Sequence, residues 1–193
     1  MTSVLKTKNL KSVKTFCFST FNDYAPKGIG QALKTIYNSP TTPIILCVGS
    51  DLVIGDSLGP LCGTMLKSKN INSFIYGTLK NPITAKEMPY ISTYLKKTHP
   101  SSPIITIDAA VGNNDDIGLI KVINKGIKPG LGVNKDFETL GDLSIIGIIA
   151  SKTKNNHALY SLTRLNLVYK TATMITDGVV DFLSSYQNKT HFA

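Results

Sequence analysis

Two aspartates, Asp56 and Asp108, lie where a pair of carboxyl groups can carry out hydrolysis. An apolar run typical of a buried strand precedes each of them, 44–48 ahead of Asp56 and 104–107 ahead of Asp108. Ligands of open α/β sheets bind outside the carboxyl ends of the strands, and in a flavodoxin-like strand order, 2-1-3-4-5, the first and third strands are neighbours. We therefore expect the two acids to face each other in one crevice.

This pairing has a chemical consequence, because two neighbouring carboxylates do not both ionise easily. The pKa of one rises, and the pair holds a proton at neutral pH. One acid can then activate a water molecule while the other protonates a leaving amine, which is what amide hydrolysis requires. Each acid also has a structural alternative: Asp56 could cap the helix that Pro60 begins, and Asp108 could be a turn residue before Gly112.

Ser57 offers a different chemistry. The stretch from Gly55 to Gly59 matches the G-x-S-x-G pattern of a nucleophile elbow and contains the letters GDSL of an esterase family. An elbow places its serine directly after a strand, whereas seven residues separate Gly49 from Ser57. The serine also needs a histidine base, and His157 is the one candidate among the three histidines. Neither phosphate-binding glycine pattern follows the first strand.

Apolar periodicity predicts the elements that position these residues. Short apolar runs alternate with amphipathic ones, which predicts a β-α-β-α-β unit with a parallel sheet and two further strands. The expected strands are 44–48, 73–77, 104–107, 117–123 and 143–150, and the expected helices are 28–37, 58–66, 84–97 and 163–184. We therefore expect a three-layer α/β/α fold with a mostly parallel sheet.

The first part of the chain has a different composition. Residues 1–42 are polar, basic and mostly irregular, so we expect a basic N-terminal appendage to a single α/β domain of residues 43–193. A covering or propeptide role for the appendage is a hypothesis that follows from this change. At 42% hydrophobic and 17% charged residues, the chain is expected to form a globular core rather than to be disordered.

Charge and cysteine content indicate partners and compartment. The net charge of +9 favours acidic partners, but no basic helix or interleaved aromatic residues indicate specific nucleic-acid binding. The three cysteines lack paired spacing and are expected to be free thiols in a reducing compartment. No apolar run approaches the roughly 18 residues of a membrane helix, and no secretory signal is recognised, so the cytoplasm is expected.

An ordered set of motifs resembles the YyaC-type sporulation proteins. The motifs are VGSD at 48–51, GDSLGP at 55–60, ITIDA at 105–109, KPGLGV at 128–133 and GDLSI at 141–145. The resemblance covers roughly residues 43–182. That family is similar to the spore germination protease and, more distantly, to the hydrogenase maturation endopeptidases.

The resemblance implies a phosphorylase/hydrolase-like fold and an aspartic-type peptidase site. In the germination protease the two essential aspartates lie in a D-A-L-G-P-like and an I-D-A-like motif, and Asp56 and Asp108 hold those places here. The implied substrate is a protein or peptide, with spore proteins as candidates in the sporulating cell or forespore. In the hydrogenase endopeptidases a metal-binding glutamate follows the acid of this loop, whereas Ser57 stands there in this chain, so neither a metal nor another cofactor is expected.

Further residues are expected to bind substrate or shape the loops. Asp51 is expected to hold its loop by hydrogen bonds from the backbone to its side chain, and Gly130 and Gly132 to give the later glycine loop its backbone shape. Lys135 is expected to supply a positive charge that tunes the pKa of the two acids, with a solvated surface lysine as the alternative.

The sequence thus predicts a sporulation- or germination-associated peptidase that uses Asp56 and Asp108. One alternative is a non-catalytic sporulation factor that binds a protein partner in the same crevice. A less favoured alternative is an esterase with Ser57 as nucleophile. A homo-oligomer is compatible with either role.

Overall fold

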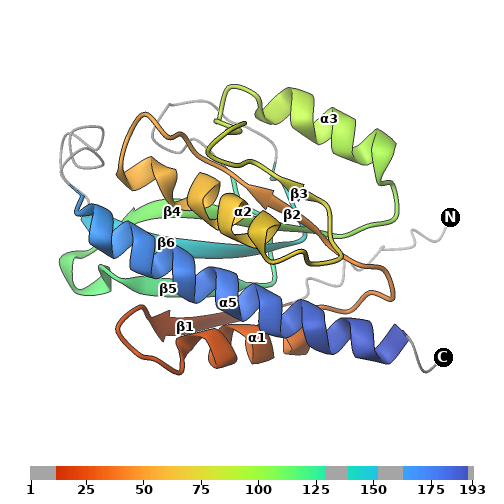
Figure 1. Cartoon of the computed structure of the whole chain (residues 1–193), viewed down its shortest axis with the longest axis horizontal. Helices are drawn as coiled ribbons and strands as arrows, with labels where there is room; N and C mark the ends of the chain where they lie inside the picture. The colour runs from red at the N-terminus through yellow and green to blue at the C-terminus, as the bar shows by residue number, and fades with distance from the viewer. Residues whose placement is uncertain (1–11, 129–138, 152–162, 191–193) are drawn as a thin grey trace, which may run out of the picture.

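The computed structural model describes residues 12–128, 139–151 and 163–190, which form a six-stranded sheet between two layers of helices (Figure 1). The strands are β1 (Thr15–Ser19), β2 (Ile44–Cys47), β3 (Ile75–Tyr76), β4 (Ile104–Gly112), β5 (Leu119–Ile123) and β6 (Leu143–Ser151). The helices are α1 (Ala25–Ile36), α2 (Leu58–Ser68), α3 (Met88–Thr98) and α5 (Leu165–Thr190), with short 3-10 turns η1 (Gly55–Ser57) and η2 (Asn114–Asp116). The expected α/β class is confirmed, with element ends that differ by a few residues.

The strand order is β1-β5-β6-β4-β2-β3. The expected placement of the first three predicted strands is confirmed, because β2 lies between β3 and β4 and is parallel to both. The expected 2-1-3-4-5 order is wrong for the last two, because β6 rather than β5 pairs with β4, and β5 is antiparallel to β6. The six residues between β4 and β5 are too few for a parallel crossover, which needs a dozen or more, so β5 turns back instead.

The N-terminal segment differs from the expected appendage. Strand β1 pairs with β5 along its whole length, from Thr15 opposite Ile123 to Ser19 opposite Leu119. Helix α1 packs against α5 (Figure 1), and a Cβ atom at Gly178 of α5 would lie 2.7 Å from the side chain of Ile29. Residues from 15 onward therefore belong to the same sheet and core as the rest of the described chain.

Both faces of the sheet are buried. Ile45 and Cys47 of β2 enter the core cluster under α1, α2 and α5, while Ile44 and Leu46 enter the cluster under α3. Successive side chains of a strand point to opposite faces, so a strand covered on both sides is a continuous apolar run. Although α5 has 26 residues, no helix in the described ranges is long and apolar enough to cross a membrane.

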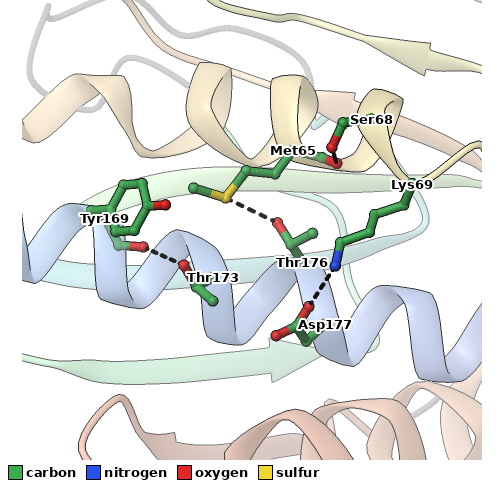
Figure 2. Close-up of polar contacts among 7 residues, drawn as sticks. All are labelled: Met65, Ser68, Lys69, Tyr169, Thr173, Thr176 and Asp177. Atoms are coloured by element: carbon green, nitrogen blue, oxygen red, sulfur yellow. Dashed lines mark hydrogen bonds and ion pairs between the residues drawn. The ribbon is translucent and has the colours of Figure 1, made fainter.

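Helices α2 and α5 lie side by side and make few polar contacts (Figure 2). Thr176 donates to the sulfur of Met65 at 3.8 Å, and Lys69 Nζ lies 3.7 Å from Asp177 Oδ1. An exposed ion pair contributes about 1 kcal/mol or less. Apolar packing therefore holds α2, and with it the turn η1 that precedes it, on the sheet.

A buried hydroxyl pair ties the N-terminal segment to α5. Thr20 and Thr171 are fully buried with their Oγ1 atoms 3.1 Å apart, and Thr171 Oγ1 also donates to the Leu167 carbonyl at 2.8 Å. Thr171→Val should lower the free energy of unfolding by about 1–3 kcal/mol, because the Thr20 hydroxyl then loses its acceptor. The measurement is urea unfolding, with the half-buried Thr173→Val as control, since Thr173 makes the same bond to the carbonyl four residues earlier.

The double variant Thr20→Val/Thr171→Val should cost less than the sum of the two single variants, because no hydroxyl is left unpaired. Strictly additive costs would contradict a coupling between the two hydroxyl groups.

Candidate functional site

The site begins where β4 extends past β2. Pairing between these strands ends at Cys47 opposite Ile107, and the last bond across is from Val48 N–H to the Ile107 carbonyl at 2.8 Å. Strand β4 stays paired with β6 as far as Gly112. Asp108 is thus the first residue of β4 beyond the end of β2. The chain leaves β2 toward β3 on one side and leaves β4 toward β5, beyond β6, on the other, so this is a topological switch point, where α/β folds bind ligands.

A closed loop returns Asp56 to the end of β2. The Ser50 amide donates to the Asp56 carbonyl at 3.1 Å, which brings the two ends of the loop together. Gly49 has φ +142°, and a Cβ there would lie 2.1 Å from the Asp56 carbonyl oxygen. Only glycine therefore permits this closure without strain.

Close backbone contacts fix the helix that follows Asp56. A Cβ at Gly59 would lie 2.0 Å from the Val48 carbonyl oxygen, and one at Gly63 would lie 1.8 Å from the Gly77 carbonyl oxygen. Helix α2 therefore packs directly on the backbone of β2 and on the chain after β3. Asp56 lies in η1 and makes no side-chain capping bond to this helix, so the capping role considered from the sequence is not observed.

The two carboxyl groups influence each other. Burial, and after it the charge of Asp56, raise the pKa of Asp108 to about 8, against a hydrogen bond of 2.8 Å from the Ala109 amide to Asp108 Oδ1. Burial also raises the pKa of Asp56, and the Ser50 amide opposes this shift. A proton is therefore held on Asp108 at neutral pH, close to a second acid that ionises more readily. The expected meeting of the two strand ends is observed.

The comparisons with known proteins fit this architecture. A family model described as "Protein of unknown function (DUF1256)" matches residues 19–178. The chain belongs to this family. It is 36% identical over 137 residues to the uncharacterized protein YyaC of Bacillus subtilis (strain 168), covering 70% of this chain and 67% of that protein.

A solved structure shares the fold of this DUF1256 protein. The crystal structure of the [NiFe] hydrogenase maturation protease HycI from Thermococcus kodakarensis KOD1 matches with a TM-score of 0.52 and 16% identity, covering 79% of this chain and 98% of that one. The likeness establishes an α/β fold that a maturation protease also has.

The other site residues predicted for this DUF1256 protein have different outcomes. Asp51 is exposed, and the turn bond expected of it is made by Ser50, whose Oγ accepts from the Leu52 amide at 3.2 Å. The glycine-loop residues and the candidate histidine lie outside the described residues; they are Gly130, Gly132, Lys135 and His157. His99 follows α3, and its Nε2 lies 2.8 Å from the hydroxyl of Tyr76 in the edge strand β3.

Two backbone groups that sequence reasoning missed support the acids. They are the amides of Ser50 and Ala109, whose contacts with Asp56 and Asp108 are described above. Both positions fall within the motifs at 48–51 and 105–109. Because an amide is common to almost every residue, the motif letters give no signal of this role.

Ser57 is buried beside the acids and is already hydrogen-bonded. It is 6% exposed, and its Oγ donates to the Ile54 carbonyl at 2.7 Å. We expect no labelling of the wild type by a serine-directed fluorophosphonate, and a loss of about 1 kcal/mol of unfolding free energy in Ser57→Ala. Mass spectrometry of the treated protein and urea unfolding check these two results. A label on the wild type that disappears in Ser57→Ala would restore the esterase alternative.

Ser57 stands where the motif resemblance implied a metal-binding glutamate in the hydrogenase endopeptidases. The residue after Asp56 is Ser57, and its hydroxyl is directed to the Ile54 carbonyl. Within residues 12–128, 139–151 and 163–190, no three side chains of histidine, cysteine, aspartate or glutamate come together as a metal ion would require.

Proposed function

We propose that this protein is a peptidase in which Asp56 and Asp108 form an aspartic-type acid/base pair. The observation that carries the proposal is the electrostatic contact of the two carboxyl groups at the switch point, where burial and the charge of Asp56 raise the pKa of Asp108 to about 8. Pairs of acids with separated pKa values are a recurring arrangement for acid/base catalysis. The fold shared with a hydrogenase maturation protease supports the same class of reaction.

The separated pKa values assign a role to each acid. The Asp56 carboxylate takes a proton from water as the water oxygen bonds to the scissile carbonyl carbon. Protonated Asp108 gives its proton to the amide nitrogen as the C–N bond breaks, which yields a carboxyl group and an amine. The proton is then on Asp56, and its transfer to Asp108 restores the pair. Lys135, in this proposal, supplies a positive charge that tunes both acids.

The proposed substrate is a protein in a sporulating cell or forespore. This context comes from the resemblance to YyaC-type and germination-protease sequences carried by the motifs around Asp56 and Asp108. The net charge of +9 favours the approach of acidic proteins. Spore proteins of both charge classes are therefore the first substrates to test.

The test uses extracts of basic and acidic spore proteins treated with the wild type, Asp56→Asn or Asp108→Asn. New amino termini are identified by mass spectrometry. The wild type should produce defined new termini, and neither variant should. Asp115→Asn is the matched control, because Asp115 is an exposed acid of η2, just past the carboxyl end of β4. This variant should produce the same new termini as the wild type.

The same experiment separates the enzyme from its main alternative. If the wild type produces no new termini, the proposal fails and the crevice becomes the binding site of a non-catalytic factor. If wild type and both variants produce the same termini, the two acids are not the catalytic pair.

A further inference from the structure

Among the described residues, no strand pairs with one edge of β4 beside the acids. Beyond Ile107 the strand continues for five residues, Asp108 to Gly112, that pair with β6 on one side. On the other side β2 has ended. No backbone hydrogen bond from another described segment reaches this edge. An unpaired strand edge is a template for a further strand.

The register identifies which groups face this edge. Val48 N–H bonds to the Ile107 carbonyl, so the backbone groups of Ile107 point toward β2. Alternate residues of a strand direct their backbone groups to the same side, so those of Ala109 and Val111 point into the space that β2 leaves. Ala109 N–H is taken by Asp108 Oδ1 at 2.8 Å. Among the described residues, the Ala109 carbonyl and both the amide and the carbonyl of Val111 remain for a partner.

The chain after β2 does not pair with this edge, because no backbone hydrogen bond joins residues 49–57 to residues 108–112. Leu58, directly after η1, lies over β6 on the face of α2 and α5, where a Cβ at Gly147 would be 2.4 Å from its Cδ2 atom. Figure 1 shows the chain running on past the end of β2 and turning back to start α2, which lies in front of β4. Asp56 lies in η1, which directly precedes this helix and lies next to β4.

Asp108 approaches the same edge from the other face. It pairs with Ile146 of β6, which packs on the cluster under α3, and paired residues of neighbouring strands project to the same face. Its carboxyl group then bends to the Ala109 amide, which points to the open edge. A backbone lying beside β4 would therefore pass between the carboxyl groups of Asp56 and Asp108.

The loop that borders this edge is apolar and exposed. Leu52 is 88% exposed and Ile54 is 40% exposed, although both follow a fully buried strand. Large apolar side chains exposed close together in the sequence indicate a binding surface. A partner that paired with β4 could cover both of them with its own apolar side chains.

We propose that an extended peptide segment with apolar side chains binds as an added strand along β4, hydrogen-bonded to the Ala109 carbonyl and the Val111 amide and covered by Leu52 and Ile54. This inference rests on the proposed function for its occupant, a protein substrate. It requires an unfolded or extended segment, because a folded protein has its own strands already paired. Strand addition gives affinity through the main chain and selectivity through alternate side chains.

The test measures binding without turnover. Full-length Asp56→Asn protein is applied to overlapping 13-residue peptides that cover the sequence of β-casein, an acidic and unfolded probe, and the tightest binder is resynthesised with single N-methyl groups at each position. Methylation at alternate residues should weaken binding about fivefold over a short stretch, because each methyl group removes a hydrogen bond of about 1 kcal/mol. The intervening positions should change binding by less than about threefold.

A variant pair tests the apolar loop. Leu52→Ser should weaken binding several-fold, whereas Val13→Ser should leave it unchanged, since Val13 is 60% exposed just before β1 at the opposite edge of the sheet. Binding by no peptide, or a methylation profile without alternation, would overturn the proposal. Binding with alternation but no cleavage by the wild type would retain the strand site and remove the peptidase. Cleavage without alternation would retain the peptidase and remove the strand site.

Discussion

The rate of peptide cleavage should fall by about 10³-fold when either Asp56 or Asp108 is replaced by asparagine, because general acid or base catalysis contributes about 10²–10⁴-fold. Asparagine has nearly the same shape as aspartate but neither accepts nor releases a proton near neutral pH. The measurement is the initial rate on a peptide spanning a cut site found in the spore-protein experiment. Asp115→Asn, with an exposed side chain in η2, should keep the wild-type rate.

The pH dependence assigns each limb of this reaction to one acid. The wild-type rate should rise as Asp56 ionises, at a pH above its ordinary pKa of 3.8, and should fall near pH 8 as Asp108 loses its proton. The residual rate of Asp108→Asn should lack the fall near pH 8, and that of Asp56→Asn should lack the acidic limb. Two variants that both keep the full wild-type profile would rule out this assignment.

Asp108→Asn should also become more stable than the wild type as pH rises. The pKa of Asp108 is about 8 in the folded protein against an ordinary value of 3.8. Between these pH values the folded chain keeps a proton that the unfolded chain has lost, so the free energy of unfolding of the wild type falls as pH increases through this window. Asparagine carries no such proton, and its contribution does not change with pH.

The stability difference between Asp108→Asn and the wild type should grow by about 3–5 kcal/mol from pH 4 to pH 8, since one pKa unit corresponds to about 1.4 kcal/mol. The lower figure allows for water at the partly exposed carboxyl group. Urea unfolding at several pH values measures it, and Asp115→Asn should follow the wild-type curve. Parallel curves for Asp108→Asn and the wild type would show that Asp108 is ionised in the folded protein. A stable asparagine variant without activity would also show that the site is maintained at a cost to stability.

The meeting of Asp56 and Asp108 could be predicted from the sequence because it depends on two adjacent parallel strands whose apolar runs are unambiguous. The place of β6 could not be predicted in the same way. A run such as Leu143–Ser151 is typical of a buried strand, but it contains no signal that it inserts beside β4 instead of beyond β5. The strand order depends on the short connection after β4. This connection turns β5 back, and the edge of β4 then remains open for β6.

Strand β1 was missed because its pattern is weak. Only five residues long, Thr15–Ser19 has half-buried or exposed side chains along an edge of the sheet, and lysines precede it in the sequence. For Ser57 the sequence signal is clear, but the structure does not support the esterase chemistry that the motif indicates. The letters around it match an esterase, but the closed loop buries the hydroxyl against the Ile54 carbonyl. Burial of this kind depends on the whole fold and cannot be predicted from the neighbouring residues in the sequence. The difference in pKa between Asp56 and Asp108 depends on burial as well.

The hydrogen bond between the Ser50 amide and the Asp56 carbonyl closes a short loop. The closed ends hold Asp56 in place, and the residues between them are left to contact a partner. Residues between these two positions can change in identity, and in number, while the ends remain joined, since doubling the length of a flexible loop costs only about 0.6 kcal/mol in closure entropy. Leu52, which is almost fully exposed, belongs to this exchangeable part. Under the proposed strand addition, relatives of this protein can therefore differ in the peptides they select while the position of Asp56 stays the same, and grafting this loop from one relative to another should transfer selectivity without rebuilding the acid pair.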